Sequence, residues 1–332
     1  MPTAVDIMRH MGEAPAGSGA DQSGVLPTRT LVLSAIGADG TLDAGPLFAV
    51  AGVAGHSDKA MRDCLARVVR DGLLTRVSGR GRSAQYVATG LGKAELDADI
   101  GWTALAHRVD AGLEPWDGCW HLIGFEIPER RRGARDALRS LLVELGAAPV
   151  QAGLYVHSDD LTDFVRQLAS HLGVSEAITS FVTRSLRVGN EQRQTDIVNR
   201  LWPLASLADR YDAVEQRLVS IAEQAPFTDG DRLATSMFCA IVDTEAVLRN
   251  DPLLAAELLP DDWAGMRARG AFMVAHSAVS AHSELFANSR LMQSFTAEIH
   301  RSLQETSTAF WTRWFPRLMD VYKAKLPPAA TA

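Results

Sequence analysis

The sequence predicts a multidomain α+β protein: an N-terminal winged helix-turn-helix, a middle ferredoxin-like α+β domain and a mostly helical C-terminal domain. Three observations lead to this fold class. The chain of 332 residues, 47% apolar, is longer than one small core requires. Three short helical patterns come before two apolar runs around a Gly/Arg/Ser turn. Strand and helix patterns then alternate until a helical region begins near residue 191.

The first two segments are a tail and a small DNA-binding fold. Residues 1–26 are rich in Gly, Ala, Ser and Pro, which predicts a flexible tail. We expect the winged helix-turn-helix over residues 27–92. Its predicted elements are helices at 28–36, 46–53 and 57–71 and hairpin strands at 73–77 and 84–88. Pro46 suits a first helical turn, and Ser57 and Gly72 are typical of a helix start and a helix end.

The third of these helices has one apolar face and one basic face. Met61, Cys64, Leu65 and Val68 recur at helical spacing and are expected to face the core. An α-helix fits the major groove of DNA, and arginines flanked by glycines suit a hairpin tip that approaches the DNA backbone or minor groove. The residues that we expect to contact DNA are Ser57, Lys59, Arg62, Ala66, Arg67, Arg80 and Arg82.

The charge distribution supports this prediction. Residues 28–92 hold eight basic and five acidic side chains, a net charge of +3, whereas the whole chain has a formal net charge of -7. A basic segment on an acidic body is typical of a polyanion-binding domain. Two alternatives remain at this point: an ordinary solvated helix face, or a winged helix that contacts another protein.

The rest of the chain divides into a linker and two domains. Residues 93–116 are predicted to form a connecting helix, over 91–111, and a linker. The ferredoxin-like domain is expected over residues 117–190, with strands at 120–127, 153–157 and 178–188, helices at 128–145 and 161–172, and room for a minor extra strand. The helical domain is expected over residues 191–326. Its predicted helices are 195–224, 231–248, 263–286 and 291–322, with breaks at Pro203, Pro252, Pro260 and Pro316.

The motif search predicts no catalytic residue, no metal site and no bound cofactor. The sequence has no P-loop, no GxGxxG after a strand, no HExxH and no GxSxG. The preferred interpretation is therefore a protein that is not an enzyme. The alternative is a metal-dependent nuclease, or another enzyme, that uses the middle or C-terminal domain. Three widely spaced cysteines and the lack of an apolar run of roughly 18 residues predict a cytoplasmic protein that does not bind membranes.

Three ordered groups of motifs resemble the PaaX-type family of transcriptional repressors, which regulate phenylacetic acid catabolism and related pathways. The resemblance covers about residues 27–270. The motifs are residues 60–67, 70–74 and 79–86 in the head, Trp116-Asp117-Gly118-Cys119-Trp120 and Gly153-Leu154-Tyr155-Val156 in the middle, and Arg249-Asn250-Asp251-Pro252-Leu253-Leu254 with residues 258–265 further on.

The resemblance implies a winged-helix head, a middle domain similar to the small CRISPR-associated adaptation nuclease, and a helical C-terminal domain. It also implies a homodimer that binds double-stranded operator DNA and is released by a small-molecule effector, phenylacetyl-CoA or another aryl-acyl-CoA or a related aromatic acid. Five arginines of the helical domain suit the anion-binding edge of an apolar pocket: Arg200, Arg210, Arg249, Arg267 and Arg269.

Overall fold

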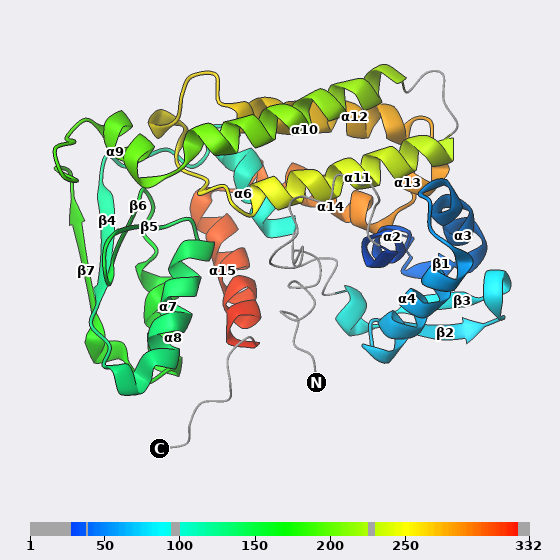
Figure 1. Ribbon diagram of the computed structural model, residues 1–332, viewed down its shortest axis with the longest axis horizontal. Helices are drawn as coiled ribbons and strands as arrows, with labels where there is room; N and C mark the ends of the chain where they lie inside the picture. Colours follow the sequence, from blue (N-terminus) through cyan, green and yellow to red (C-terminus); the bar gives the residue numbers. More distant parts are fainter. Residues whose placement is uncertain (1–27, 38, 94–99, 225–229, 325–332) are drawn as a thin grey trace. The chain divides into compact units, whose positions relative to one another are not determined.

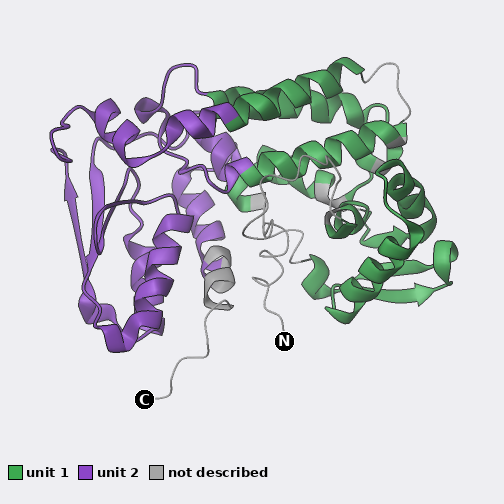
Figure 2. Ribbon diagram, viewed as in Figure 1, with its two compact units in different colours: residues 1–104, 210–246, 264–301 green, residues 105–209, 247–263, 302–332 purple. Residues whose placement is uncertain are grey.

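The computed structural model describes residues 28–37, 39–93, 100–224 and 230–324 (Figure 1). The chain forms two compact units (Figure 2). Unit 1 consists of residues 1–104, 210–246 and 264–301, and unit 2 of residues 105–209, 247–263 and 302–332. The predicted tail at 1–26 lies outside the described residues. No helix within the described ranges has the length and apolar character needed to span a bilayer.

The N-terminal part of unit 1 combines three helices with a small sheet. In chain order its elements are α2 (Thr28–Ser34), β1 (Thr41–Asp43), α3 (Ala44–Val53), α4 (Asp58–Arg70), β2 (Leu74–Ser78), the 3₁₀ turn η1 (Gly81–Ser83) and β3 (Gln85–Ala88). The strands are antiparallel in the order β1-β3-β2. The three predicted helices and the hairpin are therefore present, whereas β1 was not expected.

Local chemistry explains the position of α4. The Ser57 hydroxyl accepts a hydrogen bond from the Ala60 N–H at 3.2 Å, as an N-cap should. Gly72 follows the helix with a φ of +79°, a conformation that glycine adopts freely. Met61, Cys64, Leu65 and Val68 are buried, as their spacing predicts, and burial raises the pKa of the Cys64 thiol.

Helices complete unit 1. They are the larger parts of α10 (Leu204–Gln224) and α11 (Gly230–Leu248), all of α12 (Ala264–Ser280) and α13 (Glu284–Ala287), and α14 (Arg290–Ser302) up to Arg301. The Ser289 hydroxyl, between α13 and α14, donates to the Ser34 carbonyl at the end of α2, at 2.5 Å. Gly37 forms a β-bridge with the same serine. The N-terminal elements therefore pack directly on helices from the C-terminal third of the chain.

Unit 2 contains a four-stranded antiparallel sheet. Its elements are β4 (Trp120–Phe125), the 3₁₀ turn η2 (Glu129–Arg131), α7 (Arg132–Glu144), β5 (Ala148–Gln151), β6 (Leu154–His157), α8 (Thr162–His171), the 3₁₀ turn η3 (Ser175–Ala177) and β7 (Ile178–Thr183). The strand order is β5-β6-β4-β7, and α7 and α8 lie on the same side of the sheet (Figure 1). The core includes Trp120, whose ring stacks on Trp202 with centroids 6.3 Å apart.

Three helices complete unit 2 with the start of α10. They are α6 (Ile100–Asp110) from Leu105 onwards, α9 (Gln194–Leu201) and α15 (Ser307–Ala324). The predicted connecting helix over 91–111 appears as helical residues 90–93 and as α6, with residues 94–99 outside the described part. The predicted break at Pro203 is confirmed, since it separates α9 from α10.

Two expectations about the last helices were wrong. The predicted helix at 291–322 is interrupted between Ser302 and Ser307, and Pro316 lies inside α15 without ending it. An interior proline costs a helix roughly 3 kcal/mol. Burial of Phe310, Trp314 and Met319 on α15 outweighs that cost, because each large apolar side chain contributes about 1.5–3 kcal/mol.

Candidate nucleic-acid interface

The face of α4 opposite its buried residues is exposed and basic. Arg62, Ala66 and Arg67 are all exposed there, and Arg70 extends the same face by one turn. Within the part of the chain that the structure describes, no ion pair is recorded for Arg62 or Arg67. The sequence therefore placed these three predicted residues correctly on an accessible helix face. Contact of these residues with DNA stays a prediction.

Lys59 lies on the same face but has a partner. Its ammonium group donates to Asp63, one turn further along, at 2.7 Å. This hydrogen bond is the main reason why the pKa of the Asp63 carboxyl lies below its usual value. Both side chains are exposed, and exposed ion pairs are weak because water screens them. An incoming phosphate could therefore replace Asp63 as the partner of Lys59.

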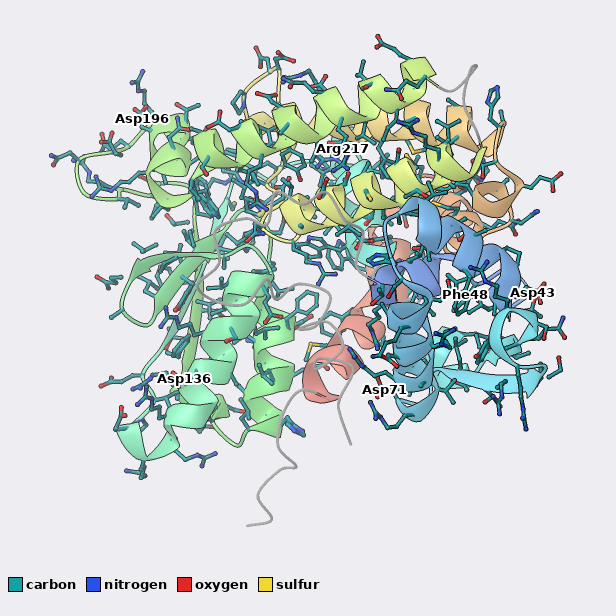
Figure 3. All side chains as sticks on the ribbon, turned by 45° about the vertical axis from the view of Figure 1, so that its right-hand side comes forward. Asp43, Phe48, Asp71, Asp136, Asp196 and Arg217 are labelled. Atoms are coloured by element: carbon teal, nitrogen blue, oxygen red, sulfur yellow. The ribbon has the colours of Figure 1, made fainter. Side chains whose placement is uncertain are left out.

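Arg82 connects the hairpin to α4. Its guanidinium donates to the two carboxylate oxygens of Asp58, at 3.0 and 3.3 Å, and lies over the ring of Phe48 at 5.6 Å. Figure 3 shows Phe48 on α3 beside the hairpin. Asp58 is the first residue of α4, so this contact fixes the hairpin tip against the start of the helix. The predicted role of Arg82 in DNA contact thus competes with an internal structural role.

The hairpin tip depends on glycine at one position in particular. Gly79 has a φ of +66°, and a Cβ there would lie 1.9 Å from the Ser83 carbonyl oxygen. No other residue fits this turn without moving the backbone. The tight turn leaves Arg80 exposed, as the sequence predicted.

Sequence reasoning did not include Arg70 and Arg76 among the contact residues. Arg70 ends α4 and Arg76 lies on β2, and both are exposed. Only Leu74 of the five residues in β2 is buried, so the strand projects with both faces accessible. The count of eight basic residues over 28–92 includes Arg70 and Arg76, and it is the sequence feature that could have identified them. Arg29, by contrast, pairs with Asp71 at 3.3 Å, and both are largely buried, so Arg29 joins α2 to the end of α4.

The motifs of the middle region form structural contacts within unit 2. Asp117 accepts a hydrogen bond from the Cys119 N–H at 2.7 Å and so forms the turn before β4. The Nε2 atom of His157 donates to the Pro252 carbonyl at 3.1 Å, because its Nδ1 atom accepts from the Asp159 N–H. Asp251 accepts from the Leu253 N–H and supports its positive φ of 48°. The Asp-Pro motif is thereby anchored to the sheet.

Two further predictions concern ligands. Among the described residues, no group of three or more His, Cys, Asp or Glu side chains is placed to hold a metal ion. Three arginines proposed for an anion-binding edge make internal contacts instead. Arg267 pairs with Asp212 and Glu215, buried Arg269 lies against Tyr211, and Arg210 donates to the Ala246 carbonyl.

The fold and this surface define a modular α+β protein with a basic helix-and-hairpin head. Comparison with known families identifies the rest of the chain. The PaaX protein central Cas2-like domain matches residues 113–195, and the PaaX-like protein C-terminal domain matches residues 202–289. Together the matches span more than half of the 332 residues. The chain belongs to the PaaX family, a family of transcriptional regulators.

Comparison with solved structures shows a similar fold. The uncharacterized protein Rv0674 from Mycobacterium tuberculosis is 21% identical, with a TM-score of 0.52. The alignment covers 82% of this chain and 99% of that chain. No curated protein matches the sequence significantly.

Proposed function

We propose that this protein is a DNA-binding transcriptional regulator, a repressor of a catabolic operon, and that α2, α3, α4 and the β-sheet form a winged helix-turn-helix. The observation that carries the proposal is the exposed basic face of α4 beside a projecting basic hairpin, in a chain of the PaaX family. In this interpretation α4 enters the major groove. Arg62 and Arg67 read bases, Lys59 and Arg80 contact phosphates, and Ser57 and Arg82 hold the surface in place. Ala66 leaves room for the base edges.

The order of elements in the central domain supports the ferredoxin-like assignment. The succession β4-α7-β5-β6-α8-β7 is the β-α-β-β-α-β pattern of that fold. β5, which the sequence left as a minor extra strand, completes this pattern. The element order supports the predicted boundary of this domain at 117–190, and the boundaries at 27–92, 93–116 and 191–326 stay predictions from the sequence.

The protein is proposed to act as a homodimer that pairs through β7. This strand is one edge of the sheet, and its middle residues are exposed, including Phe181 at 47% and Val182 at 57%. An unprotected edge with exposed apolar residues is prone to pair with another strand. Antiparallel pairing of two copies about Ser180 would place Ile178 opposite Val182 of the second copy. It would also place Glu176 beside Arg184 of the second copy, so the ends are complementary in charge.

The dimer has a direct test in solution. The native mass should be twice the chain mass of 35.9 kDa. Val182→Lys should give monomers, because each lysine would lie opposite the apolar Ile178 of the second copy, and a charged side chain on an edge strand opposes pairing. Val143→Lys is the matched control, since Val143 is a similarly exposed valine on α7. A Val182→Lys variant that remains dimeric would place the dimer contact elsewhere.

The proposed effector is an aryl-acyl-CoA such as phenylacetyl-CoA, or a related aromatic acid, bound away from the head. Release from DNA requires the effector to bind the free protein more tightly than the DNA-bound form, by about 1–3 kcal/mol of coupling for a useful switch. The support for this class of effector is the family membership alone, and no residue is assigned to its binding.

One experiment tests the function as a whole. The full-length protein is used to capture duplex fragments of the genome that encodes it, and the retained fragments are sequenced. The expected result is a short, pseudo-palindromic site upstream of catabolic genes. Phenylacetyl-CoA, other aryl-acyl-CoAs, the free acids and CoA are then titrated into the complex. Random retention of fragments would contradict the proposal, and metal-dependent cleavage of them would support the nuclease alternative instead.

A further inference from the structure

A second basic segment lies in the central domain, outside the proposed winged helix. Residues 128–140 contain two carboxylates, Glu129 and Asp136, and five arginines, Arg130, Arg131, Arg132, Arg135 and Arg139. The net charge is +3 over 13 residues of a chain whose total is -7. This segment carries the same net charge as residues 28–92 but is only one fifth as long. Neither the fold of the central domain nor the proposed α4 surface explains it.

These arginines occupy η2 and the first turns of α7. Arg132, Arg135 and Arg139 recur at i, i+3 and i+7, so they share one flank of the helix over two turns. Ala134, Leu138, Leu141 and Leu142 are buried on a different side of the same helix. Arg130, Arg132 and Arg139 are exposed and Arg135 is half-buried. The charges therefore form a row on the surface of unit 2.

The two carboxylates neutralise the row only in part. Arg135 donates to Glu129 at 2.9 Å, and Arg132 donates to Asp136 at 3.4 Å. Arg131 donates to the Leu172 carbonyl at the end of α8, which orders its side chain but leaves its charge. For Arg130 and Arg139 no ion pair is recorded in the described part of the chain. Three positive charges thus remain without a countercharge from this segment.

Helix stability does not account for the row. Cations near the start of a helix face the positive end of its dipole, at a cost of about 0.3–1 kcal/mol each. Arg131 and Arg132 stand at this end of α7. The exposed ion pairs with Asp136 and Glu129 contribute little, because water screens them. An external polyanion would supply the missing countercharges.

The spacing and composition favour duplex DNA as that polyanion. From Arg132 to Arg139 the helix rises about 10 Å, since each residue adds about 1.5 Å. One strand of a DNA duplex presents a phosphate roughly every 3.4 Å along the helix axis, so the row spans about three phosphates. Single-stranded nucleic acids are bound with aromatic stacking platforms, and residues 128–144 contain no aromatic residue. We propose that Arg130, Arg132, Arg135 and Arg139 form a sequence-independent contact surface for the phosphates of duplex DNA, additional to α4.

This inference rests on the proposed function, in that the protein must bind DNA, but a separate variant tests it. The test uses the full-length chain, a fluorescent duplex of random sequence and salt concentrations from about 50 to 200 mM, where counterion release governs affinity. The double variant Arg130→Ala, Arg139→Ala removes two arginines that make no recorded ion pair. The control Arg187→Ala, Arg193→Ala removes two exposed arginines from the same unit. Figure 3 labels Asp196, the partner of Arg193, at the opposite end of unit 2 from Asp136.

The expected result is a change in the slope of log affinity against log salt. Each lost phosphate contact makes this negative slope shallower by about 0.9, so the double variant should make it shallower by about 1.8. Affinity near 0.1 M salt should fall on the order of 60-fold, by the same relation. The control variant should keep the wild-type slope. Thermal unfolding of both variants checks that each remains folded.

Three results would overturn the inference, and they differ from failure of the proposed function. The first is a salt slope of the Arg130→Ala, Arg139→Ala variant equal to that of the control, while the Arg62→Ala, Arg67→Ala variant still loses operator binding. In that case the proposed function stands and the contact surface on α7 is refuted. The second is a preference of the wild type for a single strand of equal length over the duplex. The third is no salt-dependent duplex binding by the wild type, in which case the proposed function fails as well.

Discussion

The stabilities of the Gly79→Ala and Gly81→Ala variants, compared with each other, test whether the backbone of the hairpin tip requires glycine at position 79. Both glycines have positive φ, +66° and +58°. An L residue in this conformation costs roughly 1–2 kcal/mol, and the lower entropy of the unfolded chain returns about 0.4–1 kcal/mol. A Cβ at Gly81 would meet nothing within 4 Å. Gly81→Ala should therefore lower the free energy of unfolding by about 0–1.6 kcal/mol.

Gly79→Ala adds a steric clash to the same backbone cost. The new Cβ would lie 1.9 Å from the carbonyl oxygen of Ser83 and 2.6 Å from its carbonyl carbon. Ordinary contact begins near 3.4 Å, so the Ser83 peptide must move by about 1.5 Å. Extra atoms forced into a packed site typically cost about 1–3 kcal/mol. Ser83 directly follows Arg82 in the chain, so this movement should also weaken the contact of Arg82 with Asp58.

The measurements are thermal unfolding and duplex-DNA binding of both full-length variants. Gly79→Ala should have the lower melting temperature and the weaker binding, with Gly81→Ala close to the wild type in both. Equal behaviour of the two variants would refute the reasoning, because it would mean that the tip can rearrange around a side chain at position 79.

Three further predictions address the head, the sheet and the helical region. Arg62→Ala or Arg67→Ala should weaken binding to the selected operator by about 1–3 kcal/mol if the residue reads a base, and competition with random DNA would show this as lost specificity. Trp120→Ala should lower the free energy of unfolding by about 3–5 kcal/mol in urea titrations, because the ring is buried against Trp116 and Trp202; unchanged stability would contradict a core role. Burial lowers the pKa of His276 below its usual 6.5, so the folded state binds fewer protons than the unfolded chain, and stability should decrease as pH falls below about 6.5. His276→Phe should remove that part of the pH dependence, and a variant with the wild-type pH profile would show that His276 does not cause it.

The elements that sequence predicted well are those with a strong local pattern. α4 has an N-cap, a clean apolar stripe and a terminal glycine, so its bounds could be predicted closely. β1 was missed because Thr41–Asp43 is only three residues long, too short for its polar-apolar-polar alternation to predict a strand, and it forms only by pairing Thr41 with Val87, far along the chain. β5 contains Pro149, which argues against a strand, yet it lies at an edge of the sheet where proline is tolerated.

In the candidate interface, too, the features set by local spacing could be predicted and those set by the tertiary fold could not. Helical spacing was enough to place Arg62, Ala66 and Arg67 on an exposed face, and the pair of Lys59 with Asp63 follows from their separation by one turn. The partners of Arg82 and Arg29 could not be predicted. Asp58 and Asp71 lie 24 and 42 residues away from them in sequence, and only the tertiary fold brings each pair together.

The arginines of the head fall into two groups, those that form ion pairs within it and those for which none is recorded. Arg29 and Arg82 form ion pairs that fix α2 and the hairpin against α4, so they set the shape of the surface. Arg62, Arg67, Arg70, Arg76 and Arg80 are exposed, and no ion pair is recorded for them among the described residues. These five supply charge that the fold does not use. Neutralising Arg29, whose ion pair with Asp71 is largely buried, should therefore change stability and DNA binding together, whereas neutralising one of these five exposed arginines should change DNA binding alone.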